Sequence, residues 1–214
     1  NLILQASLLI SGQSDVGHKK TDLPKNLNAD IWNKNKNESI KSIEALGQFL
    51  DEVMKTGITR KNNSYIPYDT ALLPLVYLFS RFDSNSHRQK ATLYKIAKFY
   101  FIYTALSLRF TEGAAGKQSI DKSLLVDCVN SDSFSPYING IKERFSGLDD
   151  KVTKSGAKGK AVLIVQSANG LKDPLSMNPI DLSRDHELLH IFPKDFLKKI
   201  AGRKGLSISE DHIC

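Results

Sequence analysis

The sequence predicts a mainly α-helical fold, and three observations support this prediction. Apolar residues recur at helical spacing through most of the first 165 residues, which indicates roughly six or seven helices there. Hydrophobic residues make up 41% of the 214-residue chain and charged residues 25%, an ordinary globular composition that can build a core. No repeat of fixed period is visible.

The N-terminal quarter is expected to hold two helices separated by a loop. Residues 1–10 are apolar enough for one core helix. Residues 11–37 are polar and rich in Asn and Lys, so we expect an exposed loop with Trp32 as its anchor. A second helix is predicted from Glu38 to Lys55. Its apolar positions are Ile40, Ile43, Leu46, Leu50 and Val53, with Phe49 and Met54 beside them, and Gly57 closes it.

Two further helices are predicted before residue 110. Asp69 is expected to cap a helix that carries Pro74 near its beginning, where proline is tolerated. The segment 87–110 is the longest helix candidate, and His87 is expected to lie at its solvated start. Its aromatic residues could stack bases in principle, but at helical spacing among Leu and Ile they are expected to be core. One face contains Leu93, Ile96, Ala97, Tyr100, Phe101, Thr104 and Leu108.

Shorter helices and a linker are expected after residue 110. The string "TEGAAGKQ" breaks the long helix, and residues 117–129 and 136–146 predict two shorter amphipathic helices. Residues 149–160 are rich in lysine and glycine and are the best candidate for a linker or mobile loop. The apolar run "AVLIVQSANG", residues 161–170, fits a helix or a strand, and periodicity leaves both open.

The net charge and the cysteine content indicate which class of binding partner and which cellular compartment to expect. The formal net charge is +7, which favours a polyanionic partner, nucleic acid first, although surplus lysine also occurs on proteins that bind none. The two cysteines, Cys128 and Cys214, follow no metal or redox spacing, so we expect a reducing, cytoplasmic setting. No segment reaches the roughly 18 apolar residues that a membrane span needs, so no membrane partner is expected.

One apparent phosphate-binding motif fails on inspection. The string "GAAGKQS" places a lysine after a glycine, but a phosphate loop needs an earlier glycine where this chain has Thr111. It also needs Ser or Thr after the lysine, where this chain has Gln118. A helix C-cap and a turn are the expected structure instead.

The stretch "DHELLHIFPKDFLKK", residues 185–199, carries residues suited to catalysis. The part before Pro193 alternates like a short strand, and proline can end a strand and begin a helix. Ile191 and Phe192 would anchor this turn and hold His190, whose reference pKa of about 6.5 suits a proton acceptor at neutral pH. A helix is then predicted up to Gly202. The cations expected to contact nucleic-acid phosphates are Lys194, Lys198, Lys199, Arg203 and Lys204.

The string His190-Ile191-Phe192-Pro193-Lys194, preceded by Asp185 and Glu187, resembles the first half of an HNH, or ββα-metal, nuclease motif. More narrowly, it is similar to the C-terminal part of GmrSD-type modification-dependent restriction endonucleases. Residues 65–81, 94–117 and 158–183 resemble the helical segments and the lead-in of that family, so the likeness covers roughly residues 60–200. Of these pieces, the "HIFPK" string is the specific one.

The resemblance implies a helical domain over residues 1–160, followed by a partial HNH nuclease domain over residues 161–214 that is incomplete at its C-terminal end. It implies a cytoplasmic, antiphage restriction enzyme that hydrolyses DNA, with modified DNA as a candidate substrate and His190 as the general base. A divalent metal ion, Mg²⁺ or Mn²⁺, is implied as cofactor, with Glu187 and Asp185 as candidate ligands. An upstream nucleotide-binding domain, absent from this chain, is implied as a partner.

The sequence departs from the family pattern in two places. Leu189 occupies the position of a metal ligand and cannot coordinate a cation. The remaining Asn or His ligand of the motif would lie beyond Cys214. Two alternatives therefore stay open beside the nuclease: a nuclease-derived module that binds DNA or a partner without cutting, and a helical scaffold without a nucleic-acid role. His186 and His212 are expected to face solvent.

Overall fold

The computed structural model describes residues 2–12, 23–56, 65–82, 86–145, 156–170, 172, 177–179, 199 and 202–203. Within these ranges the chain is helical apart from turns and one isolated antiparallel bridge between Lys172 and Pro179, which confirms the mainly α prediction. The chain divides into two units, Asn1–Ser183 and Arg184–Cys214. The domain boundary expected after residue 160 falls inside the last described helix of the first unit.

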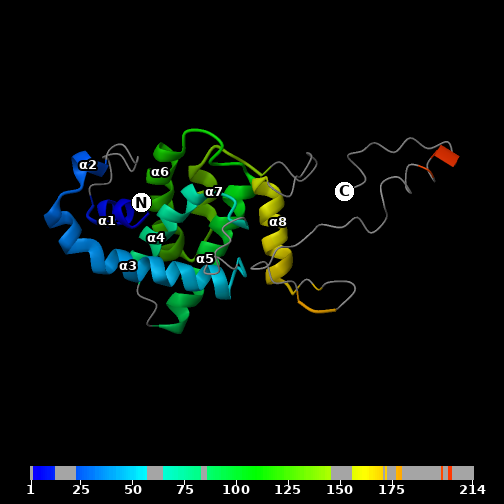
Figure 1. Cartoon of the computed structure of the whole chain (residues 1–214), viewed down its shortest axis with the longest axis horizontal. Helices are drawn as coiled ribbons and strands as arrows, with labels where there is room; N and C mark the ends of the chain where they lie inside the picture. Colours follow the sequence, from blue (N-terminus) through cyan, green and yellow to red (C-terminus); the bar gives the residue numbers. More distant parts are fainter. Residues whose placement is uncertain are drawn as a thin grey trace. The chain divides into compact units, whose positions relative to one another are not determined.

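The first unit is a bundle of helices around one apolar core (Figure 1). Helix α4 lies at its centre and packs against α1, α3, α5 and α6, while α8 packs against α5. Because α4 is covered on several sides, most of its residues from Leu72 to Phe79 are buried, as expected for a helix with apolar residues all round. The elements are α1 (Leu2–Ile10), α2 (Leu23–Asn26), α3 (Ala29–Glu52), η2 (Asp69–Ala71), α4 (Leu72–Arg81), α5 (His87–Leu106), α6 (Ala114–Ser131), α7 (Ser135–Gly140) and α8 (Ala157–Ala168).

The expected loop over residues 11–37 is wrong for its second part, where α2 lies and α3 begins. The Asn28 side chain caps α3 by accepting a hydrogen bond from the Ile31 N–H at 2.9 Å, so the helix starts well before Glu38. Asn35 and Ser39 are buried although both are polar, because each side chain donates to the carbonyl four residues earlier, at 2.8 Å in both cases. Since this buried stripe is polar, apolar periodicity did not reveal the first turns of α3.

The apolar face predicted for α3 is correct at its C-terminal end and wrong at one position. Leu46, Phe49 and Leu50 are buried in the core, whereas Ile40 is 40% exposed. The helix is also longer than α5, which the sequence had predicted to be the longest.

Helix α4 begins later than expected. In α5, the buried positions largely match those that were predicted. Asp69 does not cap α4: it opens the 3-10 turn η2, and neither helix start has a side-chain cap hydrogen bond. In α5, which starts at an exposed His87, the predicted core positions from Leu93 to Thr104 are buried. The prediction that Leu108 belongs to this core face is wrong. Leu108 lies beyond the helix end in a left-handed conformation (φ 54°) and is 42% exposed.

The last three helices correct the boundaries expected after residue 110. Helix α6 starts at Ala114 after Gly113, whose φ of 63° suits glycine, so the "GAAGKQS" string begins a helix instead of capping the end of one. Helix α7 is shorter than predicted. Helix α8 begins at Ala157, inside the expected linker, and resolves "AVLIVQSANG" as helix. The buried positions Lys158 and Gly159 explain the difference, because this end of α8 packs into the bundle.

Candidate functional site

Most of the predicted nuclease residues lie outside the described part of the chain. These are the expected base His190, the expected metal ligands Asp185 and Glu187, and Leu189, which stands at the position of a metal ligand. The predicted phosphate contacts Lys194, Lys198 and Lys204 lie outside it as well. Two predicted DNA contacts, Lys199 and Arg203, are described: both are helical and exposed. Gly202 is helical as well, so the prediction that this glycine closes a helix is wrong.

The described residues contain no group of three or more His, Cys, Asp or Glu side chains close enough to hold a metal ion. The expected ligands Asp185 and Glu187 are outside that search. None of the described helices is both long and apolar enough to cross a membrane.

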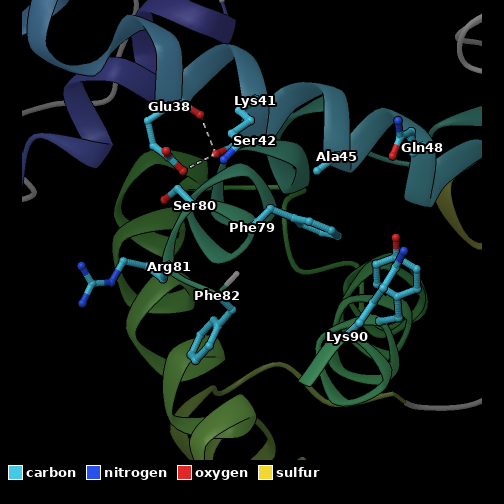
Figure 2. Close-up of a pocket in the computed structure, with 11 residues that line it drawn as sticks. Glu38, Lys41, Ser42, Ala45, Gln48, Phe79, Ser80, Arg81, Phe82 and Lys90 are labelled. Atoms are coloured by element: carbon cyan, nitrogen blue, oxygen red, sulfur yellow. Dashed lines mark hydrogen bonds between the residues drawn. The ribbon is translucent and has the colours of Figure 1, made fainter. Parts of the chain in front are cut away.

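A solvent-open cavity of about 320 Å³ lies in the first unit, where α3, the end of α4 and the start of α5 meet (Figure 2). Its cationic side chains are Lys41 from α3, Arg81 from α4 and Lys90 from α5, against one carboxylate, Glu38. Its other lining residues are Ser42, Ala45, Gln48, Phe79, Ser80, Phe82 and Tyr94. We name this cavity and its rim the basic groove.

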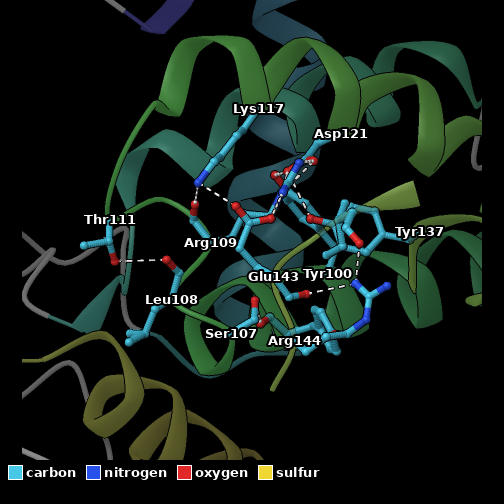
Figure 3. A network of polar contacts seen from close by, with 12 residues as sticks. Tyr100, Ser107, Leu108, Arg109, Thr111, Lys117, Asp121, Tyr137, Glu143 and Arg144 are labelled. Carbon is cyan, nitrogen blue, oxygen red and sulfur yellow. Dashed lines mark hydrogen bonds and ion pairs between the residues drawn. The ribbon is translucent and has the colours of Figure 1, made fainter. Parts of the chain in front are cut away.

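A second feature, the most extensive polar network among the described residues, is buried between α5, α6 and α7 (Figure 3). Its centre is Asp121 on α6, which is fully buried. The Arg109 guanidinium, just beyond α5, donates to this carboxylate from Nε at 2.9 Å and from Nη2 at 2.6 Å. Because Arg109 is only 3% exposed, the two charges form a buried, hydrogen-bonded ion pair.

Two tyrosine hydroxyls complete the shell around Asp121. Tyr100 of α5 donates to Oδ2 at 3.1 Å, and Tyr137 of α7 donates to the same oxygen at 3.0 Å. Burial raises the pKa of the Asp121 carboxyl, and the hydrogen bonds from Arg109 and the two phenols oppose that rise. Burial and the nearby Asp121 charge raise the pKa of both tyrosines well above the ordinary value, so both hydroxyls stay protonated donors.

An outer pair closes the network toward solvent. Glu143 pairs with the Nη1 of Arg109 and, through its other oxygen, with Lys117 Nζ at 2.6 Å. Partial burial raises the pKa of Glu143, but the Lys117 hydrogen bond and the charges of Arg109 and Lys117 outweigh it and hold that pKa at about 2. Lys117 also donates to the Arg109 carbonyl at 2.7 Å, so its ammonium is held between this carbonyl and Glu143.

This network connects helices of the bundle and has a structural role. The Asp121 carboxylate accepts five hydrogen bonds from three side chains and is fully buried, so it cannot reach a substrate or a water from bulk. The network ties the end of α5 to α6, α7 and the segment after α7. It therefore fixes the geometry of this part of the bundle.

Sequence reasoning missed Asp121, Arg109 and Glu143. A signal was present in α6, where the buried positions follow helical spacing although three of them are polar or charged. The buried positions are Gln118, Asp121, Lys122, Leu125, Cys128 and Val129. A charged residue in such a stripe indicates a buried partner, because an unpaired buried charge is costly. The identity of the partner could not be deduced, since Arg109 comes from another element.

Comparisons with protein-family models, with curated proteins and with solved structures found no match to this chain.

Proposed function

We propose that the protein containing this chain is a metal-dependent DNA endonuclease of the HNH type, acting in an antiphage restriction system. The observation that carries the proposal is the string His190-Ile191-Phe192-Pro193-Lys194 with two carboxylates upstream. Supporting observations are the net charge of +7 and the exposure of Lys199 and Arg203, two of the predicted phosphate contacts.

In the proposed reaction, the neutral imidazole of His190 accepts a proton from a water molecule, and the resulting hydroxide attacks a backbone phosphorus of DNA. The P–O bond to the leaving sugar oxygen then breaks, and that oxygen takes up a proton from solvent. A divalent cation, when bound, stabilises the charge on the phosphate and on the leaving oxygen. Glu187 and Asp185 would hold it, since carboxylate oxygens suit Mg²⁺ and Mn²⁺.

The cations after the motif position the substrate in this proposal. Lys194, Lys198, Lys199, Arg203 and Lys204 contact backbone phosphates, which hold the duplex in place without reading its sequence. Such contacts make binding weaken as salt rises, because each phosphate contact releases counterions.

The test is a nicking assay on supercoiled plasmid with Mg²⁺ or Mn²⁺, comparing the protein with its His190→Ala variant. Loss of the base is expected to reduce the cleavage rate by about 10²–10⁴-fold. His186→Ala is the matched control, because it removes a neighbouring imidazole with no assigned role and is expected to leave the rate unchanged. Equal cleavage by His190→Ala and the unmodified protein would remove His190 as the base.

A second candidate function is a nuclease-derived module that binds DNA without cutting it, and Leu189 is the observation that favours it. Leucine stands at the position of a metal ligand, so the cation would have fewer protein ligands than in the related motif. This candidate predicts salt-sensitive DNA binding without cleavage, and cleavage after Leu189→His or Leu189→Asp. If both variants bind metal but remain inactive, the candidate is contradicted.

A further inference from the structure

We propose that the basic groove of the first unit binds the phosphate backbone of duplex DNA. The residues that line this groove run from Glu38 to Tyr94 and belong to the first unit, whereas the proposed nuclease residues belong to the second. The inference therefore goes beyond the proposed function: DNA binding at the groove does not require the chain to cut DNA.

The first step of the reasoning concerns charge. Lys41 and Arg81 are exposed and Lys90 is half-buried, and none of the three has a carboxylate partner among the described residues. Three cations face one carboxylate, so the lining carries a surplus of two positive charges. Unpaired cations gathered at a concave surface concentrate an anionic partner there, because the low-dielectric walls focus their field.

The second step concerns rigidity. The three cations come from three different helices that pack into the same core, so their spacing is set by the bundle. Phe79 points into the space between α3 and α5 (Figure 2), where its ring contacts Phe49 and Tyr94 at centroid distances of 5.7 and 6.1 Å. Lys90 Nζ lies over the Tyr94 ring at 5.2 Å from its centroid, which restricts this lysine before any ligand binds.

The third step concerns the class of ligand. The hydroxyls of Ser42 and Ser80 donate to carbonyls of their own helices at 2.7 Å, so they are not available as donors for a small ligand. What the groove offers is positive charge with little directional hydrogen bonding, which suits backbone phosphates better than a specific metabolite. A cavity of about 320 Å³ is too small to enclose a duplex. We therefore expect the sugar-phosphate backbone of one strand to lie along its rim.

The test measures binding of a fluorescent duplex of about 20 base pairs by anisotropy, in EDTA so that no cleavage occurs, over a salt series that starts near 50 mM. The groove variant is Lys41→Ala/Arg81→Ala/Lys90→Ala. We expect weaker binding to all duplex sequences, and a slope of log affinity against log salt that is smaller by about three, one for each lost phosphate contact. Glu38→Gln is expected to tighten binding, because it removes the one opposing charge.

Two control variants test whether binding depends on the charge at the groove, on the total charge of the chain or on the shapes of the three side chains. Lys25→Ala/Lys142→Ala/Lys172→Ala removes the same charge from exposed lysines elsewhere in the first unit, and is expected to leave the slope almost unchanged. Lys41→Arg/Arg81→Lys/Lys90→Arg keeps the groove charge and is expected to keep binding. Equal losses in the groove and control triples would overturn the proposal, as would unchanged duplex binding in a folded groove variant or an effect confined to single-stranded DNA. These results are independent of the nicking assay, so failure of either proposal is seen separately.

Discussion

Replacing Asp121 by alanine should destabilise the helical bundle strongly. The substitution removes the acceptor of the Arg109 contacts at 2.6 and 2.9 Å and of the Tyr100 and Tyr137 hydroxyls at 3.1 and 3.0 Å. Arg109, which is 3% exposed, would keep Glu143 as its one acidic partner among the described residues. Removing one member of a buried ion pair costs about 3–5 kcal/mol, because the other charge stays buried without its partner. We expect a loss of this size in the free energy of unfolding.

The measurement is urea denaturation followed by circular dichroism, with the midpoint and slope fitted together. Asp127→Ala is the matched control: it removes an exposed carboxylate from the same helix and should change stability by no more than about 0.5 kcal/mol. Tyr137→Phe removes one hydrogen bond to the charged carboxylate and should cost about 1.5–3 kcal/mol. A loss below about 1 kcal/mol for Asp121→Ala would refute the assignment of Asp121 as the centre of a buried network.

Two further predictions test the outer pair and the backbone. Because the pKa of Glu143 is about 2 in the folded chain and near 4.5 when unperturbed, its stabilising contribution is complete above about pH 4.5 and is lost as pH falls toward 2. Urea midpoints at several pH values should therefore fall less steeply with acid in Glu143→Gln than in the unmodified protein; parallel curves would contradict the pairing. Gly113→Ala should lower stability by about 1 kcal/mol because its φ is 63°, whereas Gly47→Ala, inside α3 with open space around the added Cβ, should raise it by about the same amount. A thermal melt of both variants checks the two opposite signs.

Much of the fold could be predicted from apolar spacing, and the missed start of α3 has a clear physical cause. The core face of α5 from Leu93 to Thr104 was readable because one side of that helix is apolar. The first turns of α3 were not, since the buried Asn35 and Ser39 satisfy their polar groups within their own helix. In the bundle, Ser39 also meets Ser7 of α1 at 2.8 Å between the hydroxyl oxygens. Polar residues of this kind are typical of loops, and only packing shows that they are buried.

By itself, the sequence determined the mainly helical class, most of the core positions and the one string from which a nuclease is proposed. Local spacing carries this information, because helical periodicity and short motifs are properties of neighbouring residues. Tertiary structure alone decided which of the described charged side chains form ion pairs. Arg109 and Asp121 are twelve residues apart and form a buried pair, while Lys41, Arg81 and Lys90 come from three helices and gather at one groove. Both arrangements depend on how the helices pack, and that packing brings together residues that no local pattern connects.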